Sequence, residues 1–257
     1  MIITITQEEI VNNQSTIEKM QTMKLFGMAR AFRETYSSNH KLTPDEMLAF
    51  LIDAEWDERY NRKLARLIKE AKFRQHARIE EIDTRQSRNI DKNMIMRFSD
   101  SGWIRKAENI IVTGATGSGK SFISSAIGHH ACVNGFKTLY RNCIKLFSNL
   151  KMSKADGTFT REMKKFKLAD LLILDDFGLS PMDADSRLAL LEILEDRIGI
   201  KSTVIASQFP VKKWFEIIGD PTIADAIVDR IIHSSHKIEL KGDSMRKNSG
   251  NILPPDN

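Results

Sequence analysis

The sequence has little cysteine and no long apolar run. Its two cysteines, Cys132 and Cys143, are too few for a disulfide framework and match no zinc-binding spacing, so we expect reduced thiols in a cytoplasmic protein. No stretch approaches the roughly 18 consecutive apolar residues of a transmembrane helix, and we therefore expect none. The N-terminal segment MIITITQEEI lacks the basic region and the long apolar stretch of a secretory signal, so secretion is not predicted.

Composition and length are ordinary for a globular protein. The chain has 257 residues, of which 41% are hydrophobic and 28% are charged. These values exclude wholesale disorder and a fibrous repeat. The length suits one large domain or two small ones. The formal net charge of +5 is a mild basic bias and indicates little by itself.

The basic residues are gathered in two stretches. Every charged residue from Arg59 to Arg78 is basic except Glu70, and basic residues also dominate residues 137–167. Such stretches suggest a polyanionic partner, most often nucleic acid. The alternative interpretation is that each stretch is a solvated helix face.

The first third of the chain is predicted to be all-helical. Residues 1–84 show helical periodicity, and we interpret them as an N-terminal domain that contacts a partner or DNA. Capping boxes at residues 15–18 (STIE) and 43–46 (TPDE) are expected to begin helices. After the second box, apolar residues recur every three or four positions, which predicts one long amphipathic helix to about Arg78.

This long helix is expected to have an apolar stripe and a separate basic face. The stripe residues are Leu48, Leu51, Ile52, Trp56, Tyr60, Leu64, Leu67 and Ile68. At ~100° per residue, the basic side chains point away from the stripe, which we expect to pack on the first helix. The DNA-binding candidates on this face are Arg59, Arg62, Lys63 and Arg66.

The pattern changes near residues 85–105, which we interpret as a linker. From 106 to 247, short apolar segments alternate with helical ones, which predicts an α/β domain with a parallel sheet flanked by helices. The expected strands are Asn109–Thr113, Thr138–Arg141, Leu171–Asp175, Thr203–Ser207 and, more weakly, Lys237–Leu240. Residues 248–257 contain turn formers without a pattern and are expected to form a disordered tail.

The strongest motif lies directly after the first expected strand. The octapeptide GATGSGKS at residues 114–121 fits the phosphate-binding P-loop pattern and precedes a helical segment. Glycines let backbone N–H groups surround phosphate oxygens at a helix N-terminus, Lys120 should reach the β- and γ-phosphates, and Ser121 should ligate Mg²⁺. The expected nucleotide-binding residues are Gly114, Ala115, Thr116, Gly117, Ser118, Gly119, Lys120, Ser121 and Phe122.

Polar residues also end the third and fourth expected strands. The apolar run from Leu171 ends in Asp175 and Asp176. We expect Asp175 to hold Mg²⁺ and Asp176 to orient or deprotonate the attacking water. The fourth strand is followed by Gln208, which is the better candidate for contact with the γ-phosphate or the water, with Ser207 as the alternative.

Together these segments resemble the AAA+ ATPases of the initiator and helicase-loader group, and most closely the IstB family of transposition helper proteins. The resemblance rests on GATGSGKS, LLILDDFG and ASQFP. It extends to MKLFGMA at 23–29, AEWDER at 54–59, AKF at 71–73, DRIIHSSH at 229–236 and GDSMR at 242–246. It covers roughly residues 15–247.

The resemblance implies a bacterial, cytoplasmic ATPase that uses ATP and Mg²⁺. It implies assembly of copies side by side on duplex DNA as a ring or filament, and contact with a transposase. By the same resemblance Arg230 is the arginine finger supplied to a neighbouring copy, and Arg246 is a nucleotide sensor. Asn142–Lys167 would be a DNA-gripping helical insertion, with Lys145, Lys151 and Lys154 as candidate contacts.

One departure from the AAA+ pattern concerns the residue after the Mg²⁺-binding aspartate. Many members have glutamate there, whereas this chain has Asp176, which is shorter by a methylene. We therefore expect slow hydrolysis that DNA or a partner stimulates. The alternatives are a helicase loader of the DnaC type, a P-loop small-molecule kinase and a DNA-coating protein that binds ATP without hydrolysing it.

Overall fold

The computed structural model describes residues 7–37, 42–84 and 89–242. The chain forms two compact units, and the boundary between them follows Arg66, inside helix α3 (Pro44–Ala71). The linker predicted at 85–105 does not coincide with this boundary. Instead, α4 (Lys92–Ser99) and α5 (Gly102–Arg105) lie there, and Phe98 and Trp103 are buried in the core of the second unit. Their large apolar side chains exclude a solvated linker.

The N-terminal unit contains α1 (Gln7–Thr22), α2 (Phe26–Ser37) and most of α3. The capping box that begins α3 is present. The Thr43 N–H donates to the Glu46 carboxylate over 2.8 Å, and the Glu46 N–H donates to the Thr43 hydroxyl oxygen over 3.4 Å. The box predicted at residues 15–18 is wrong. These residues lie inside α1, and Glu18 instead accepts a hydrogen bond from Gln14.

Helix α3 differs from its prediction in length and in burial. It ends at Ala71, because the next residue, Lys72, has a left-handed backbone with φ 60°, which an α-helix cannot continue. Leu51 and Leu67 are buried, but much of the predicted apolar stripe is exposed, including Trp56 with 73% of its surface accessible. Periodicity identified the helix correctly but overestimated how much of the stripe is covered.

Helices α2 and α3 meet through one glycine and one buried carboxylate. Glu55 of α3 accepts hydrogen bonds from the N–H groups of Gly27 (2.8 Å) and Met28 (3.3 Å), in the first turn of α2. These N–H groups have no partner within their own helix, so Glu55 caps α2 from outside. The contact gives a physical reason for two of the family-like segments, MKLFGMA and AEWDER.

The second unit is built on a five-stranded parallel sheet with strand order β2-β3-β4-β1-β5. The strands are β1 (Asn109–Gly114), β2 (Thr138–Asn142), β3 (Leu171–Phe177), β4 (Ser202–Ser207) and β5 (Ser235–Leu240). All five predicted strands are therefore present. Parallel order brings the carboxyl ends of β1, β3 and β4 to one edge, where ligands bind in open α/β sheets.

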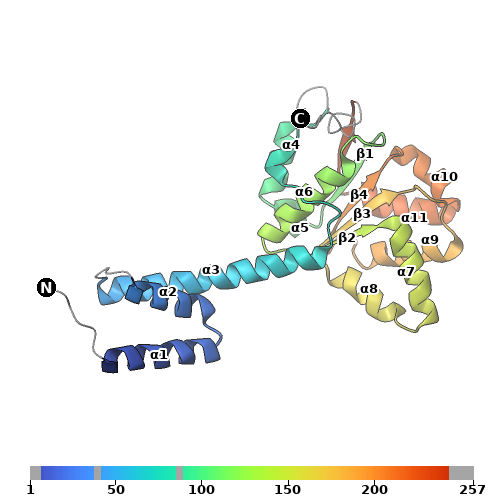
Figure 1. The fold of residues 1–257 in the computed structure, drawn as a ribbon. Helices are drawn as coiled ribbons and strands as arrows, with labels where there is room; N and C mark the ends of the chain where they lie inside the picture. The colour runs from blue at the N-terminus through green and yellow to red at the C-terminus, as the bar shows by residue number, and fades with distance from the viewer. Residues whose placement is uncertain (1–6, 38–41, 85–88, 243–257) are drawn as a thin grey trace, which may run out of the picture. The chain divides into compact units, whose positions relative to one another are not determined.

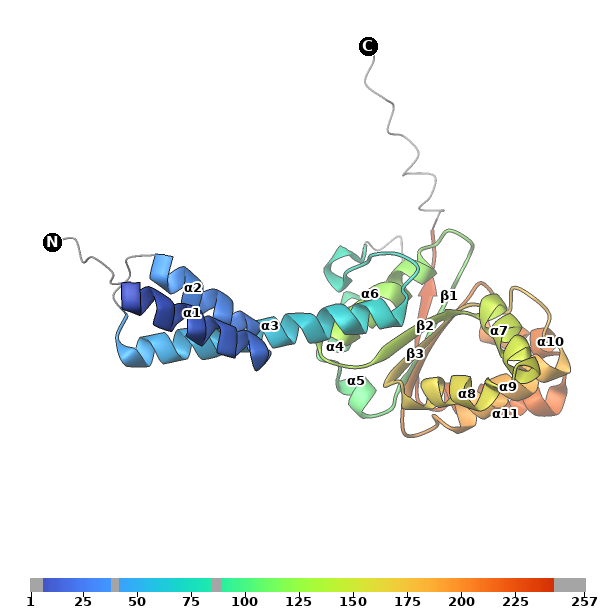
Figure 2. The same cartoon turned by 60° about the horizontal axis from the view of Figure 1, so that its bottom comes forward.

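Helices cover both faces of this sheet, as Figures 1 and 2 show. On one face lie η1 (Ile79–Glu81), α4, α5 and α6 (Lys120–Val133). On the other face lie α7 (Cys143–Ala155), α8 (Phe159–Leu168), α9 (Ala184–Glu195), η3 (Val211–Lys213), α10 (Trp214–Ile218) and α11 (Pro221–Ile232).

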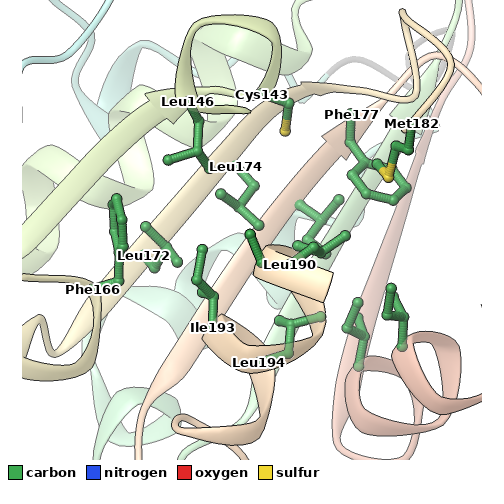
Figure 3. Packing of buried hydrophobic residues seen from close by; sticks show 14 of the residues in the cluster. Cys143, Leu146, Phe166, Leu172, Leu174, Phe177, Met182, Leu190, Ile193 and Leu194 are labelled. Atoms are coloured by element: carbon green, nitrogen blue, oxygen red, sulfur yellow. The ribbon is translucent and has the colours of Figure 1, made fainter. Parts of the chain in front are cut away.

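The side chains of β3 alternate between the two cores, as strand geometry requires. Leu171 and Ile173 pack with α6, whereas Leu172 and Leu174 pack with α9 and its neighbours. Figure 3 shows Leu172 and Leu174 directed toward Leu190, Ile193 and Leu194. The sheet is thus fixed from both sides, which makes its carboxyl edge a rigid support for a site.

The insertion after β2 is present as two helices, α7 and α8, in place of a single crossover helix. This agrees with the predicted extra length of Asn142–Lys167. Among the described helices, none is both long enough and apolar enough to span a bilayer.

Candidate nucleotide-binding site

The loop between β1 and α6 has the backbone of a phosphate-binding loop. Gly119 is the N-cap of α6 with φ 93°, a left-handed conformation that favours glycine. At Gly114, a Cβ atom would lie 2.8 Å from the Leu240 carbonyl oxygen, so the adjacent strand leaves room only for glycine. The first N–H groups of α6 lie at this loop, and a helix N-terminus favours an anion.

Lys120 is buried within this loop. Its Nζ donates to the carbonyl oxygens of Gly114 (2.8 Å) and Ala115 (2.9 Å). An ammonium group held against the loop carbonyls is a compact positive charge at the phosphate position. This geometry fits the predicted role of Lys120 toward a triphosphate.

A cavity of about 570 Å³ opens in front of the loop. Its volume lies in the range of small-molecule and cofactor sites. Predicted site residues in its lining are Thr116, Gly117, Gly119, Lys120, Ser121, Phe122, Asp176 and Gln208. The other lining residues are Arg74, Gln75, Glu81, Ile82, Asp83, Ile90, Ile123 and Leu179. The cavity thus joins the P-loop to the ends of β3 and β4.

Asp175 at the end of β3 is fully buried. Its Oδ2 accepts a hydrogen bond from the Tyr140 hydroxyl, while Oδ1 has no hydrogen-bond partner among the described residues. Burial raises the pKa of the Tyr140 phenol well above its usual range, and the charge of Asp175 raises it further, so the phenol remains a donor. A buried carboxylate oxygen without a donor is a fitting ligand for a hard cation such as Mg²⁺.

Asp176 reaches the same place because β3 is irregular there. In a regular strand, neighbouring side chains point to opposite faces. Here Asp176 has φ 58°, and the β3–β4 register shifts between Leu174 and Phe177. Both carboxylates therefore lie within 3.6 Å of one atom, Arg74 Nη1.

Asp176 is held by two donors. Its Oδ2 accepts from Asn142 Nδ2 over 2.7 Å and from Arg74 Nη1 over 3.0 Å. Asn142 ends β2, where its Cα is paired with that of Asp175 in the sheet register, and its Oδ1 also caps α7. The side chain of Asp176 is 22% exposed and faces the cavity, so it remains accessible to water.

The end of β4 distinguishes the two predicted candidates there. Gln208 Oε1 accepts from the Thr116 hydroxyl of the P-loop over 3.0 Å, and Gln208 lines the cavity. Ser207 is buried, and its hydroxyl donates to the Phe177 carbonyl and accepts from the Phe209 N–H. The Ser207 hydroxyl is thus already engaged in the turn, and Gln208 is the residue available to a ligand.

Arg230 lies away from this cavity, in the last turn of α11. Its guanidinium forms an ion pair with Glu195 and donates to the Ala226 carbonyl over 2.8 Å. It is not among the described residues that line the cavity of its own chain. Arg246, the second predicted arginine, lies outside the described residues.

The predicted DNA-binding residues are mostly paired with carboxylates. Lys151 contacts Asp183 (3.4 Å), and Lys154 contacts Asp185 (2.7 Å) at the start of α9. Lys145 is exposed on the first turn of α7. On α3, Arg59 pairs with Glu55, and Arg62 pairs with Glu55 and Glu58, whereas Lys63 and Arg66 are exposed.

Three residues of the site were not predicted: Arg74, Tyr140 and Asn142. Asn142 carries a usable signal, because a polar residue at the end of a strand next to β3 should reach the same edge. Tyr140 lies within an apolar strand and Arg74 within a basic stretch, where sequence does not separate them from ordinary residues.

Comparison with known proteins agrees with this geometry. The family profile described as "IstB-like ATP binding protein" matches residues 18–251. A relative from Sinorhizobium fredii, "Putative insertion sequence ATP-binding protein y4pL", is 44% identical over 91% of this chain and 96% of its own.

Solved structures share the fold. The DnaI crystal structure covers 66% of this chain and 90% of its own, at a TM-score of 0.55 and 22% identity. AMPPCP-bound DnaA from Aquifex aeolicus covers 68% of this chain and 53% of its own, at a TM-score of 0.55 and 16% identity. This chain therefore shares its α/β fold with these proteins. With the family match extending over most of both units, the chain belongs to the family of IstB-like ATP-binding proteins.

Proposed function

We propose that this protein is a DNA-dependent ATPase that regulates transposition of an insertion sequence. It assembles on duplex DNA, selects the target and recruits or stimulates a transposase, and ATP hydrolysis drives disassembly. The observation that carries the enzymatic part is the meeting of the P-loop, the buried Asp175 and the accessible Asp176 at one edge of the sheet. Family membership supports the role in transposition.

The phosphate end of ATP is held by the P-loop. The N–H groups at the start of α6 bind phosphate oxygens, and Lys120 moves from the loop carbonyls to the β- and γ-phosphates. Ser121 and Asp175 are the residues that hold Mg²⁺, consistent with the buried Oδ1 of Asp175 that lacks a donor among the described residues. When bound, Mg²⁺ offsets the charge of the phosphates.

Three residues serve the hydrolytic step. Asp176 orients the attacking water and accepts its proton, and Gln208 contacts the γ-phosphate or that water from the end of β4. Arg230 enters the neighbouring copy's site after releasing Glu195, and it stabilises charge on the transferred phosphoryl group. The short side chain of Asp176 gives slow turnover, which prolongs the ATP-bound assembly.

Duplex DNA binds mainly through its phosphates. Lys145, Lys151 and Lys154 on α7 form one contact region, and Lys63 and Arg66 with the neighbouring arginines of α3 form the other. Affinity then falls steeply with salt and depends little on base sequence. The paired lysines must exchange Asp183 and Asp185 for phosphates.

A role in transposition is favoured over helicase loading, because the insertion-sequence relative matches a larger share of this chain than the helicase loader does. The insertion-sequence relative matches 91% of the chain, including most of the N-terminal unit, whereas the structure of the DnaC helicase loader covers 64% and shows the fold alone. We therefore assign the transposase as the partner of the N-terminal unit.

Single-turnover ATP hydrolysis, with and without long duplex DNA, tests the proposal. We expect DNA to raise the rate, and Asp176→Asn to abolish turnover while ATP binding persists. Transfer of phosphate to a small acceptor would favour a kinase, and binding without turnover would favour a DNA-coating protein. Co-purification with the replicative helicase in place of the transposase would overturn the assigned partner.

A further inference from the structure

The site contains a cation that the hydrolytic mechanism does not use. Arg74 Nη1 lies 3.0 Å from Asp176 Oδ2 and 3.6 Å from Asp175 Oδ2. We propose that Arg74 is an inhibitory positioning residue: it restrains Asp176 and competes with the divalent cation until nucleotide binding displaces it. This inference rests on the proposed ATPase function and adds a regulatory element to the same site.

The backbone around Arg74 is fixed to the sheet. The preceding Phe73 packs edge-on against Tyr140, with ring centroids 6.3 Å apart, and occupies the space where a Cβ at Gly128 would lie 2.6 Å from its ring. Further along, Ala77 is buried. Anchors on both sides place the Arg74 side chain at the carboxylates, so the contact does not depend on a chance position of a surface arginine.

The Arg74 contact reduces the capacity of Asp176 to act as a general base, because it engages one of the two carboxylate oxygens. A general base must accept a hydrogen bond from the water that it deprotonates. Asp176 Oδ2 already accepts from both Asn142 and Arg74, so this oxygen is occupied. Removing Arg74 leaves Asn142 to orient the carboxylate and frees a lone pair for water.

The same guanidinium lies beside Asp175, the carboxylate proposed to hold Mg²⁺. It lies within ion-pair distance of Asp175 Oδ2, next to the oxygen that has no donor among the described residues. Two positive groups beside one pair of carboxylates repel each other, so Arg74 weakens the binding of a divalent cation. Mg²⁺ and Arg74 are therefore alternatives for the same negative charge.

Arg74 is also able to leave. Its side chain is 46% exposed, so water can replace the carboxylates around the guanidinium, whereas Asp176 is 22% exposed and Asp175 is buried. It follows α3, the helix that begins in the N-terminal unit and ends at Ala71 in the second unit. A contact that solvent reaches from the arginine side and that nucleotide breaks is suited to a restraint.

The opposite interpretation is that Arg74 binds the phosphates directly and promotes hydrolysis. The two interpretations predict opposite changes in the rate of ATP hydrolysis when Arg74 is replaced. A restraint predicts that Arg74→Gln hydrolyses ATP faster and needs less Mg²⁺. A phosphate ligand predicts slower hydrolysis and weaker nucleotide binding.

The test compares Arg74→Gln with Arg74→Lys and with Arg78→Gln as a matched control. Arg78 is an exposed arginine four residues further on that contacts neither carboxylate among the described interactions. For each full-length variant, binding of a fluorescent ATP analogue is measured against Mg²⁺ concentration, and single-turnover hydrolysis is measured separately. For Arg74→Gln, we expect the Mg²⁺ concentration for half-maximal binding to fall about fivefold and the hydrolysis rate to rise about fivefold, as loss of a partly exposed ion pair allows. Arg74→Lys should lie between Arg74→Gln and the unmodified chain, and Arg78→Gln should match the unmodified chain.

A background variant separates restraint from general destabilisation. In an Asp176→Asn chain, adding Arg74→Gln should give no further rate increase, because the base that it releases is absent, whereas the Mg²⁺ effect through Asp175 should persist. An unchanged Mg²⁺ dependence, or slower hydrolysis, in Arg74→Gln overturns the inference. If the unmodified chain takes up no nucleotide, the proposed ATPase function itself fails.

Discussion

Replacing Gly27 with alanine should force α2 and α3 apart and destabilise the N-terminal unit. A Cβ at this position would lie 2.2 Å from the Ala54 carbonyl oxygen and 2.7 Å from Glu55 Cα. Both are backbone atoms of a long helix and cannot rotate away. The helices must separate by at least about 1 Å to restore ordinary packing contact, which also lengthens the hydrogen bonds from the start of α2 to Glu55.

The magnitude follows from these two effects. Overpacking a close contact costs about 1–3 kcal/mol. Weakening hydrogen bonds to a charged acceptor costs a further ~1–3 kcal/mol. We therefore expect a loss of about 3 kcal/mol in the N-terminal unit, or roughly a 100-fold drop in its folding equilibrium constant. Helix propensity has the opposite sign, because alanine normally stabilises a helix by about 0.5–1 kcal/mol relative to glycine.

Hydrogen–deuterium exchange measures this effect locally. Amides of α2 should lose protection by about two orders of magnitude, while amides of β1 and β3 in the second unit should exchange as before. Retained nucleotide binding would confirm that the second unit is intact. Equal or greater protection of α2 in Gly27→Ala would refute the close-contact reasoning, since it would mean that propensity outweighs the steric overlap.

Three further results are expected. Lys120→Ala should weaken binding of a fluorescent ATP analogue by about 10–100-fold, as loss of a charged hydrogen-bonding group implies; an affinity within twofold of the unmodified chain would contradict its role. Arg230→Ala should reduce the rate of ATP hydrolysis by ~10³-fold. Mixing Arg230→Ala chains with Asp176→Asn chains should restore part of the activity, because each variant supplies the group that the other lacks. No recovery at any mixing ratio would argue against the action of Arg230 between copies. Burial opposes ionisation of Glu55, but hydrogen bonds from Arg59 and the start of α2 outweigh it and lower its pKa. Its stabilisation of the N-terminal unit should therefore be present above the ordinary pKa of glutamate and be lost as pH falls through the lowered value, and Glu55→Gln should flatten this acid-side loss in circular dichroism.

Local patterns predicted the strands and the P-loop because their signals are contained in a few consecutive residues. The apolar run Leu171–Leu174 has the length and composition of a buried strand, and GATGSGKS carries its own backbone requirement. Parallel order then placed Asp175 and Gln208 near the loop.

What sequence did not reveal depends on contacts between distant segments. Arg74 meets Asp176 across 102 positions. The arrangement of Asp175 and Asp176 side by side requires the irregularity in β3, which no periodicity indicates. The STIE segment resembled a helix start because capping boxes also occur by chance inside helices, where flanking residues decide the outcome.

The lysine–aspartate pairs between α7 and α9 have a consequence for selectivity. Asp183 both begins α9, by accepting from the Ser186 N–H, and neutralises Lys151, while Asp185 neutralises Lys154. A ligand that approaches these ammonium groups meets carboxylates already in place, so one isolated negative group gains little by exchanging with them. Only a dense, regular array of negative charge can displace several at once, so we expect the proposed DNA-contact surface to respond to long polyanions and to bind small anions weakly.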